Sequence, residues 1–156
     1  MTEKAVPNFA SGEVTLLAFA EIDIPPYSAR QITETIEFDY EVDQARTWNG
    51  ALRNRTPPQM RKFRVTWACQ DMDSPALDGV WEGMELTADC ITEFSTGDAL
   101  STAGGERDSV SGSERTDEDT GINSYRPQLS VMVETYSIET DEWGATVGWT
   151  LVAREV

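Results

Sequence analysis

Carboxylates are the side chains with the widest chemical scope in this chain of 156 residues, which holds 28 Asp and Glu. Two groups are closely spaced: Asp71, Asp73 and Asp78 form one, and the run 117–119 forms the other. Carboxylate oxygens are the ligands that calcium prefers, but neither group has the full spacing of an EF-hand loop. We interpret both as solvated turns, and we expect no bound metal and no cofactor.

Nucleophilic catalysis has little support in the residue inventory. The chain has no histidine, so a Ser-His-Asp or Cys-His arrangement is excluded. Cys69 and Cys90 both fall on the inward side of predicted strands, whereas a catalytic thiolate needs exposure and a cationic neighbour. A disulfide between them is conceivable if their strands are neighbours, but a reducing cytosol favours buried free thiols. The sequence therefore predicts a protein without enzymatic activity.

Five tryptophans leave one chemical alternative open. Two carboxylates can hydrolyse a glycosidic bond and tryptophans can line a sugar groove, so a carbohydrate-binding or glycan-degrading β-domain is a second interpretation. Trp67 and Trp149, however, lie in strand patterns that need core residues. Burial of Trp67, Trp81 and Trp149 would remove this alternative.

The charges are segregated along the chain. Half of the 12 basic residues form a basic cluster, which consists of Arg46, Arg53, Arg55, Arg61, Lys62 and Arg64. An acidic strand face precedes it and consists of Glu37, Asp39, Glu41 and Asp43. We interpret the two as complementary surfaces of identical subunits, with pairing inside one sheet as the alternative. A net charge of −16 opposes specific binding to nucleic acid.

The elements that must position these residues are strands, because apolar and polar residues alternate with period two. The first pattern places Ile36, Phe38, Tyr40 and Val42 on a buried face, with burial starting near Ile36 because Glu34 would interrupt it. Further strands are predicted over residues 63–69, 84–91, 129–133 and 146–156. The apolar segment Gly12–Ile24 also favours a strand, ended by Pro25 and Pro26.

Short polar turns and the lack of a long helical pattern predict one all-β domain over residues 1–156, an antiparallel β-sandwich or barrel-like fold. The polar segment 95–124 is the exception, and it is either a solvated loop or an arm that reaches a neighbouring subunit. No stretch approaches the about 20 apolar residues of a membrane span, and Met1–Lys4 lacks the apolar core of a signal peptide. We therefore expect a soluble protein that is made in the cytosol and has no membrane partner.

Several segments carry a recognisable pattern. They are DIPPYSARQITETI at residues 23–36, RTWNG at 46–50, the stretch 58–90, and the ending at 125–127, 141–143 and 147–156. RTWNG is similar to a pattern of Arg-Thr-x-Asn-Gly. In the stretch 58–90, PQMRKF, CQD and ADC are similar to Pro-x-Phe-Arg-Lys-Tyr, a Cys-x-Asp turn and a Val-Asp-Cys strand. Together they resemble small structural proteins from the tail gene regions of long-tailed bacteriophages and prophages. Met60 stands where that pattern usually has an aromatic residue, and Trp48 where it has a β-branched one.

The resemblance implies a structural virion protein, most simply a tail component such as the tube, the distal ring or the tip. It would act by self-assembly into a ring or collar, with itself and other tail proteins as partners, and would be located in the virion tail after assembly in the host cytoplasm. A capsid decoration protein is a further alternative. A tube or distal ring would be expected to have a negatively charged lumen, because like charge lets DNA slide without adhering.

Overall fold

The structure is a computed structural model that describes residues 4, 6–7, 15–97 and 107–156. Its elements are β1 Ala18–Phe19, β2 Thr33–Phe38, β3 Gln44–Arg46, β4 Leu52–Asn54, the 3-10 helix η2 Pro58–Met60, β5 Phe63–Asp71, β6 Glu85–Asp89, β7 Phe94–Thr96, β8 Arg115–Thr116, β9 Asn123–Tyr125, β10 Gln128–Asp141 and β11 Thr146–Glu155. The predicted all-β, antiparallel fold class is confirmed, although no sheet closes on itself in the part of the chain that the structure describes. Among the described residues, no helix is long and apolar enough to span a membrane.

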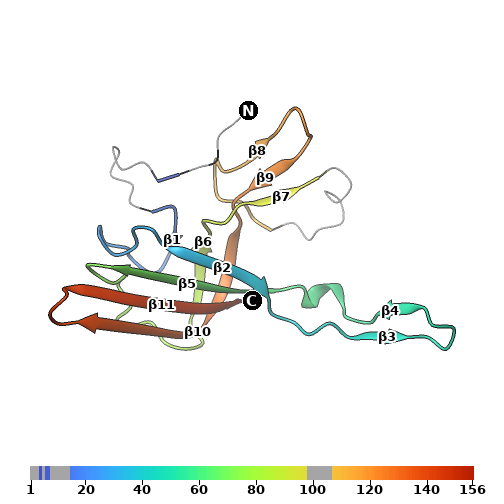
Figure 1. Cartoon of the computed structure of the whole chain (residues 1–156), viewed down its shortest axis with the longest axis horizontal. Coiled ribbons are helices and arrows are strands. Elements are labelled where there is room, and N and C mark those ends of the chain that lie inside the picture. The colour runs from blue at the N-terminus through green and yellow to red at the C-terminus, as the bar shows by residue number, and fades with distance from the viewer. Residues whose placement is uncertain (1–3, 5, 8–14, 98–106) are drawn as a thin grey trace.

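The main sheet has six antiparallel strands in the order β1-β6-β10-β11-β5-β2 (Figure 1). β10 is the longest strand, and a register shift between Val133 and Thr135 interrupts its pairing with β11. Such a bulge bends the strand and increases its twist. The sheet therefore turns at β10, so that β6 crosses the direction of β5 and β11 (Figure 1).

The hydrophobic core lies on the concave side of this bent sheet. The buried strand residues are Val65, Trp67, Cys69, Leu86, Ala88, Leu129, Val131, Val133, Trp149, Leu151 and Ala153. Leu17, Phe19 and Ile22 cover them from the N-terminal segment, and Leu77 and Val80 from the β5–β6 connection. Four of the predicted period-two patterns, at 63–69, 84–91, 129–133 and 146–156, are therefore confirmed.

The pattern predicted at 36–43 is wrong as a core strand. β2 ends at Phe38, whose side chain is 64% exposed, and Val42 is also exposed. The last backbone bond of this pairing is donated by Asp39 N to Lys62 O at 2.9 Å. Beyond it the chain leaves the sheet for the β3–β4 hairpin, so the alternation there has no core to face.

β2 instead begins before Ile36 and includes Glu34 on its inward side. The Glu34 carboxylate accepts hydrogen bonds from Trp67 Nε1 at 2.6 Å, Thr92 N at 2.9 Å and Ile91 N at 3.1 Å. A partly buried carboxylate is tolerated when N–H donors satisfy it. The expectation that Glu34 would end the buried pattern is therefore wrong, because donors from two other segments meet it.

The predicted strand over Gly12–Ile24 is wrong for most of its described part. Residues 12–14 lie outside the described residues, and only Ala18–Phe19 is strand. Leu17, Phe19 and Ile22 are buried while Ala18 and Glu21 are exposed, so the segment is not covered on both faces. It acts as a cover over the core.

The polar segment 95–124 contains regular structure where it is described. β7, β9 and β8 form a separate three-stranded antiparallel sheet in that order (Figure 1). Arg107 connects the segment that precedes β8 to the main sheet. Its guanidinium pairs with Glu155 on β11 at 3.0 Å and lies 4.2 Å from the ring centre of Phe63 on β5. Residues 98–106 lie outside the description, and the predicted contact of this segment with a neighbouring subunit stays a prediction.

Candidate subunit interface

A long hairpin projects beyond the end of the main sheet (Figure 1). We call residues 39–62 the arm. β3 and β4 pair only with each other within the described chain. At the tip, Gly50 adopts a φ of 84° and donates its N–H to Thr47 O at 2.8 Å, which closes the turn. The Asn-Gly pair at 49–50 supplies the backbone freedom that this turn needs.

The arm carries most of the predicted basic cluster. Arg46, Arg53, Arg55 and Arg61 are on the arm, Lys62 stands at its base, and Arg64 follows on β5. Arg55 pairs with Asp43 at 3.5 Å, whereas Arg46 and Arg53 form no ion pair with any described residue. Lys62 Nζ donates to Val156 O at 2.9 Å. Arg46 Nη1 donates a hydrogen bond to Gly50 O at 2.9 Å, within the turn of the arm. Near the arm tip, Arg46 and Arg53 therefore keep their charge without an ion pair to any described residue, whereas Arg55, Lys62 and Arg64 are engaged.

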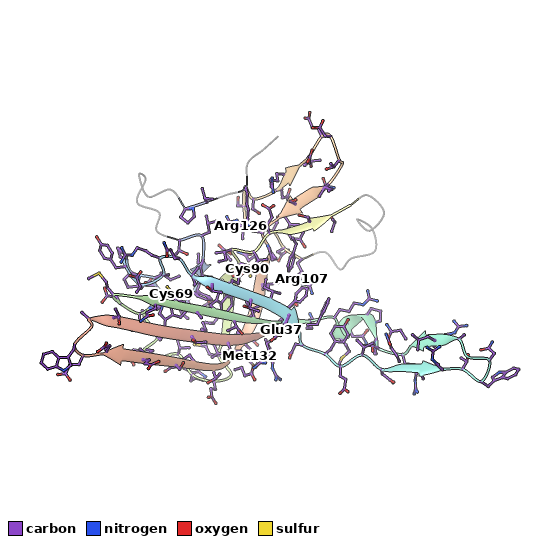
Figure 2. The ribbon with its side chains drawn as sticks, viewed as in Figure 1. Glu37, Cys69, Cys90, Arg107, Arg126 and Met132 are labelled. Atoms are coloured by element: carbon purple, nitrogen blue, oxygen red, sulfur yellow. The ribbon has the colours of Figure 1, made fainter. Side chains whose placement is uncertain are left out.

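The acidic strand face is largely paired within the same chain. Glu37, at the base of the arm (Figure 2), lies opposite Arg64 in the β2–β5 register, with their charged atoms 3.8 Å apart. Asp39 lies 3.5 Å from Arg154, and Asp43 pairs with Arg55. Glu41 has no ion pair within the described part of the chain. Pairing inside one sheet, the alternative to pairing between subunits, thus accounts for three of the four carboxylates.

Sequence reasoning missed the open edges of the main sheet. β6 pairs with β10 only through Gln128–Met132, so the stretch Thr135–Asp141 pairs with β11 on one side only. At the other edge, β2 pairs with β5 alone. Within the described chain no strand covers either outer edge. The difference in length between β10 and β6 could have indicated an open edge. Using it, however, requires knowing that these two strands are neighbours.

The convex face of the sheet is not covered by the core-forming segments. Its side chains are mostly small or polar, and they include Thr35, Thr66, Thr87, Ser137, Glu139 and Thr150. A shallow depression of about 370 Å³ lies on this face between Thr33 and Glu139. Such a surface suits contact with water or a polar neighbour rather than burial in an apolar core.

Two of the five tryptophans are buried, as the strand patterns predict. Trp67 and Trp149 are at most 2% exposed, and Trp149 Nε1 donates to Ser28 O at 2.7 Å. Trp48, Trp81 and Trp143 are 100%, 62% and 94% exposed. They lie on three different connections, and the β3–β4 and β10–β11 hairpins point to opposite ends of the molecule (Figure 1). Trp48 and Trp143 therefore cannot line the same groove.

In the first carboxylate group, Asp71 is buried and forms an ion pair, whereas Asp73 and Asp78 lie exposed in turns. Asp71 binds Arg30 through Oδ1 and Nη2 at 2.6 Å and accepts from the backbone N–H groups of Arg30 and Met72. The hydrogen bond from the Arg30 guanidinium lowers the pKa of the Asp71 carboxyl below its usual value. Asp71 thus serves to hold the N-terminal segment on β5.

The second carboxylate group forms a local turn. Asp117 Oδ1 accepts the N–H of Asp119 at 3.0 Å, as expected for a solvated Asp turn. Within the ranges that the structure describes, no three His, Cys, Asp or Glu side chains are grouped to hold a metal ion.

Cys69 and Cys90 are both free and buried (Figure 2). Their strands are not neighbours, because β10 and β11 lie between β6 and β5. Burial raises the pKa of each thiol above its ordinary value. Neither thiol is set up as a nucleophile.

Comparisons with protein-family models, curated proteins and solved structures found no match to this chain. The case for its function therefore rests on its residues and their arrangement.

Proposed function

We propose that this chain is a structural subunit of the tail of a tailed bacteriophage, and that it acts by self-assembly and protein contact rather than catalysis. The sequence resemblance to tail-region proteins suggested this role. The observation that supports it best is the part of the main sheet made by β10, β11, β5 and β2, which has an open edge on each side within the described chain.

Open edges favour assembly because each presents unpaired backbone N–H and C=O groups to another strand. β2 lies at one edge, and Thr135–Asp141 of β10 lies at the other. Addition of the β2 edge of one copy to the β10 edge of the next would use main-chain hydrogen bonds. The contact joins two different surfaces, so repeating it produces a ring when the rotation closes.

The uncovered face supports a particular orientation in such a ring. Glu37, Glu85, Glu139, Arg64 and Arg154 lie on it, and Glu134 pairs with Arg64 at 2.9 Å and with Arg154 at 3.4 Å. These four carboxylates outnumber the two arginines. With this face turned inward, the lumen of a tail tube or distal ring would be negative. A chain of net charge −16 would then repel the DNA that passes through it.

Substitution at one edge tests this proposal. Ile138, on the open half of β10, is 46% exposed, and Ile138→Lys places a charge where a second strand would add. We expect the purified wild-type chain at high concentration to form rings or short tubes in negative-stain electron microscopy, and the variant to stay monomeric with an unchanged circular dichroism spectrum.

Met132→Lys is the matched control. Met132 is 40% exposed on the same strand (Figure 2), but it is paired with Glu85 on β6 and with Arg154 on β11. It should assemble as the wild-type chain does. Equal assembly of all three proteins would refute the edge contact.

The symmetry of the assembly distinguishes the positions in the virion. Sixfold rings would support a tube or distal ring, threefold assemblies a tip, and binding across a capsid surface a decoration protein.

Carbohydrate binding is the second candidate, since Trp81 is exposed and next to Glu82. Titration with a panel of oligosaccharides, followed by tryptophan fluorescence in the wild-type chain and in Trp81→Ala, tests it. A saturable change that disappears in the variant would favour this role over a purely structural one.

A further inference from the structure

Beyond its base, the arm has no strand contact with the rest of the described chain. β3 and β4 contact each other and no other strand in the described chain. A two-stranded hairpin is marginally stable in water unless it packs against something else. Trp48 at its tip is fully exposed and Leu52 is more than half exposed. A partner surface that covers these apolar side chains would stabilise the arm.

The charge of the arm tip is opposite to that of the chain. Residues 44–56 contain Arg46, Arg53 and Arg55 and no acidic residue, whereas the whole chain carries −16. Arg46 and Arg53 have no ion pair with described residues, and the Arg55–Asp43 pair is well exposed. An acidic surface with exposed apolar residues is therefore the complementary partner.

Such a surface exists at the far end of the main sheet. β5 runs from the base of the arm, at Phe63, to this far end, at Asp71. Asp71 lies opposite Val147, next to the β10–β11 turn. We call this surface the acidic end, and its exposed members are Tyr27, Met72, Asp73, Glu139, Asp141, Glu142 and Trp143. Tyr27 O accepts the N–H groups of Met72 and Asp73, each at 3.1 Å, which holds two of its segments together. Its four carboxylates form no ion pair with described residues.

We infer that the arm of one copy binds the acidic end of a second copy of this chain. The inference rests on the assembly proposed above and adds an end-to-end contact to the edge-to-edge one. Figure 1 shows the arm and the β10–β11 hairpin at opposite ends of the longest axis. The arm therefore cannot contact the acidic end of its own copy, whereas it can contact the acidic end of a second copy placed in line with the first. The contact brings Trp48 and the tip arginines against Trp143 and the carboxylates beside it, and in a tail it would join successive rings.

Disulfide cross-linking between full-length chains tests this contact. Trp48→Cys and Trp143→Cys are made in separate chains, and the native Cys69 and Cys90 are buried and do not compete. Mixed under mild oxidation in conditions that allow assembly, the two variants should give a cross-linked dimer in at least about tenfold higher yield than either variant alone, because oriented contact raises the effective concentration of the thiols.

Trp81→Cys is the matched control, since Trp81 is also exposed but lies near the middle of β10, where Gly83 N donates to Val133 O at 2.8 Å. Its mixture with Trp48→Cys should give only background cross-linking. Assembly without preferential Trp48–Trp143 cross-linking, or equal cross-linking to Trp81→Cys, would overturn the arm contact and leave the edge contact standing. A wild-type chain that stays monomeric at every concentration would overturn both proposals.

Discussion

Glu34 and Asp71 show how single carboxylates connect distant segments in this acidic chain. Glu34 joins β2 to Trp67 on β5 and to the backbone that follows β6. Asp71 joins β5 to Arg30 and the N-terminal cover. Each unmade hydrogen bond to a buried group costs roughly 1–3 kcal/mol. Each of these two residues therefore contributes more to stability than any single exposed ion pair, which is worth about 0–1 kcal/mol.

Asp71 gives the protein a defined response to acid. Its pKa is lower in the folded chain than in the unfolded one, chiefly because of the Arg30 hydrogen bond. The stabilisation is present at neutral pH and is lost as the pH falls from about 4, the unfolded value, through the folded pKa. The difference in unfolding free energy between the wild-type chain and Asp71→Asn, measured by urea unfolding, should be largest at pH 7 and shrink below about pH 4.

Asp78→Asn is the control for this experiment, because Asp78 is exposed and forms no ion pair with described residues. It should leave the stability at pH 7 within about 0.5 kcal/mol of the wild-type value. A constant difference between the wild-type chain and Asp71→Asn at all pH values would contradict the role of Arg30.

At the scale of elements, the molecule separates a self-sufficient sheet from an arm that needs a partner. The sheet buries most of its apolar side chains and completes its pairing except at two edges. The arm leaves its apolar and basic tip exposed. This division predicts that changes on the arm affect assembly and leave folding nearly unchanged.

Charge reversal on the arm tests that division. Arg46→Glu with Arg53→Glu should change the free energy of unfolding by only about 0.5 kcal/mol per substitution, because neither residue has an ion pair with described residues. The same double variant should lower end-to-end assembly in sedimentation velocity, since like charges would then face each other.

A compensating variant supplies the control. Asp73→Lys with Glu142→Lys in the second copy restores opposite charges at the proposed contact, lies outside the β10 edge, and should recover assembly when mixed with the arm variant. Loss of assembly that this partner does not restore would contradict the pairing of the arm with the acidic end.

At the scale of the whole molecule, two electrostatic effects oppose each other. Copies of net charge −16 repel one another, whereas the proposed contact would attract the basic arm tip of one copy to the acidic end of the next. Salt weakens both effects, because the screening length falls from about 10 Å at 0.1 M to about 3 Å at 1 M.

Salt should therefore distinguish the two contacts. Edge-to-edge rings depend on backbone hydrogen bonds and should persist or increase at high salt, when repulsion is screened. End-to-end stacks should shorten, because their attraction is screened as well. Electron microscopy at low and high salt measures ring and stack lengths, and stacks that lengthen with salt would contradict the charge-based contact.

The sequence alone determined the strand character of the chain and most of its core. Period-two alternation is a local property of an extended backbone, so Val65, Trp67, Leu129 and Trp149 could be placed inside from the strand patterns. The exposure of Phe38, the partial burial of Glu34 and the two open edges depended on which strands became neighbours. Those pairings join residues far apart in the chain. That β10 extends beyond the end of β6 becomes visible only when the two strands are aligned. The tertiary structure thus decided which strand edges have no hydrogen-bonding partner within the described chain and are available to another copy.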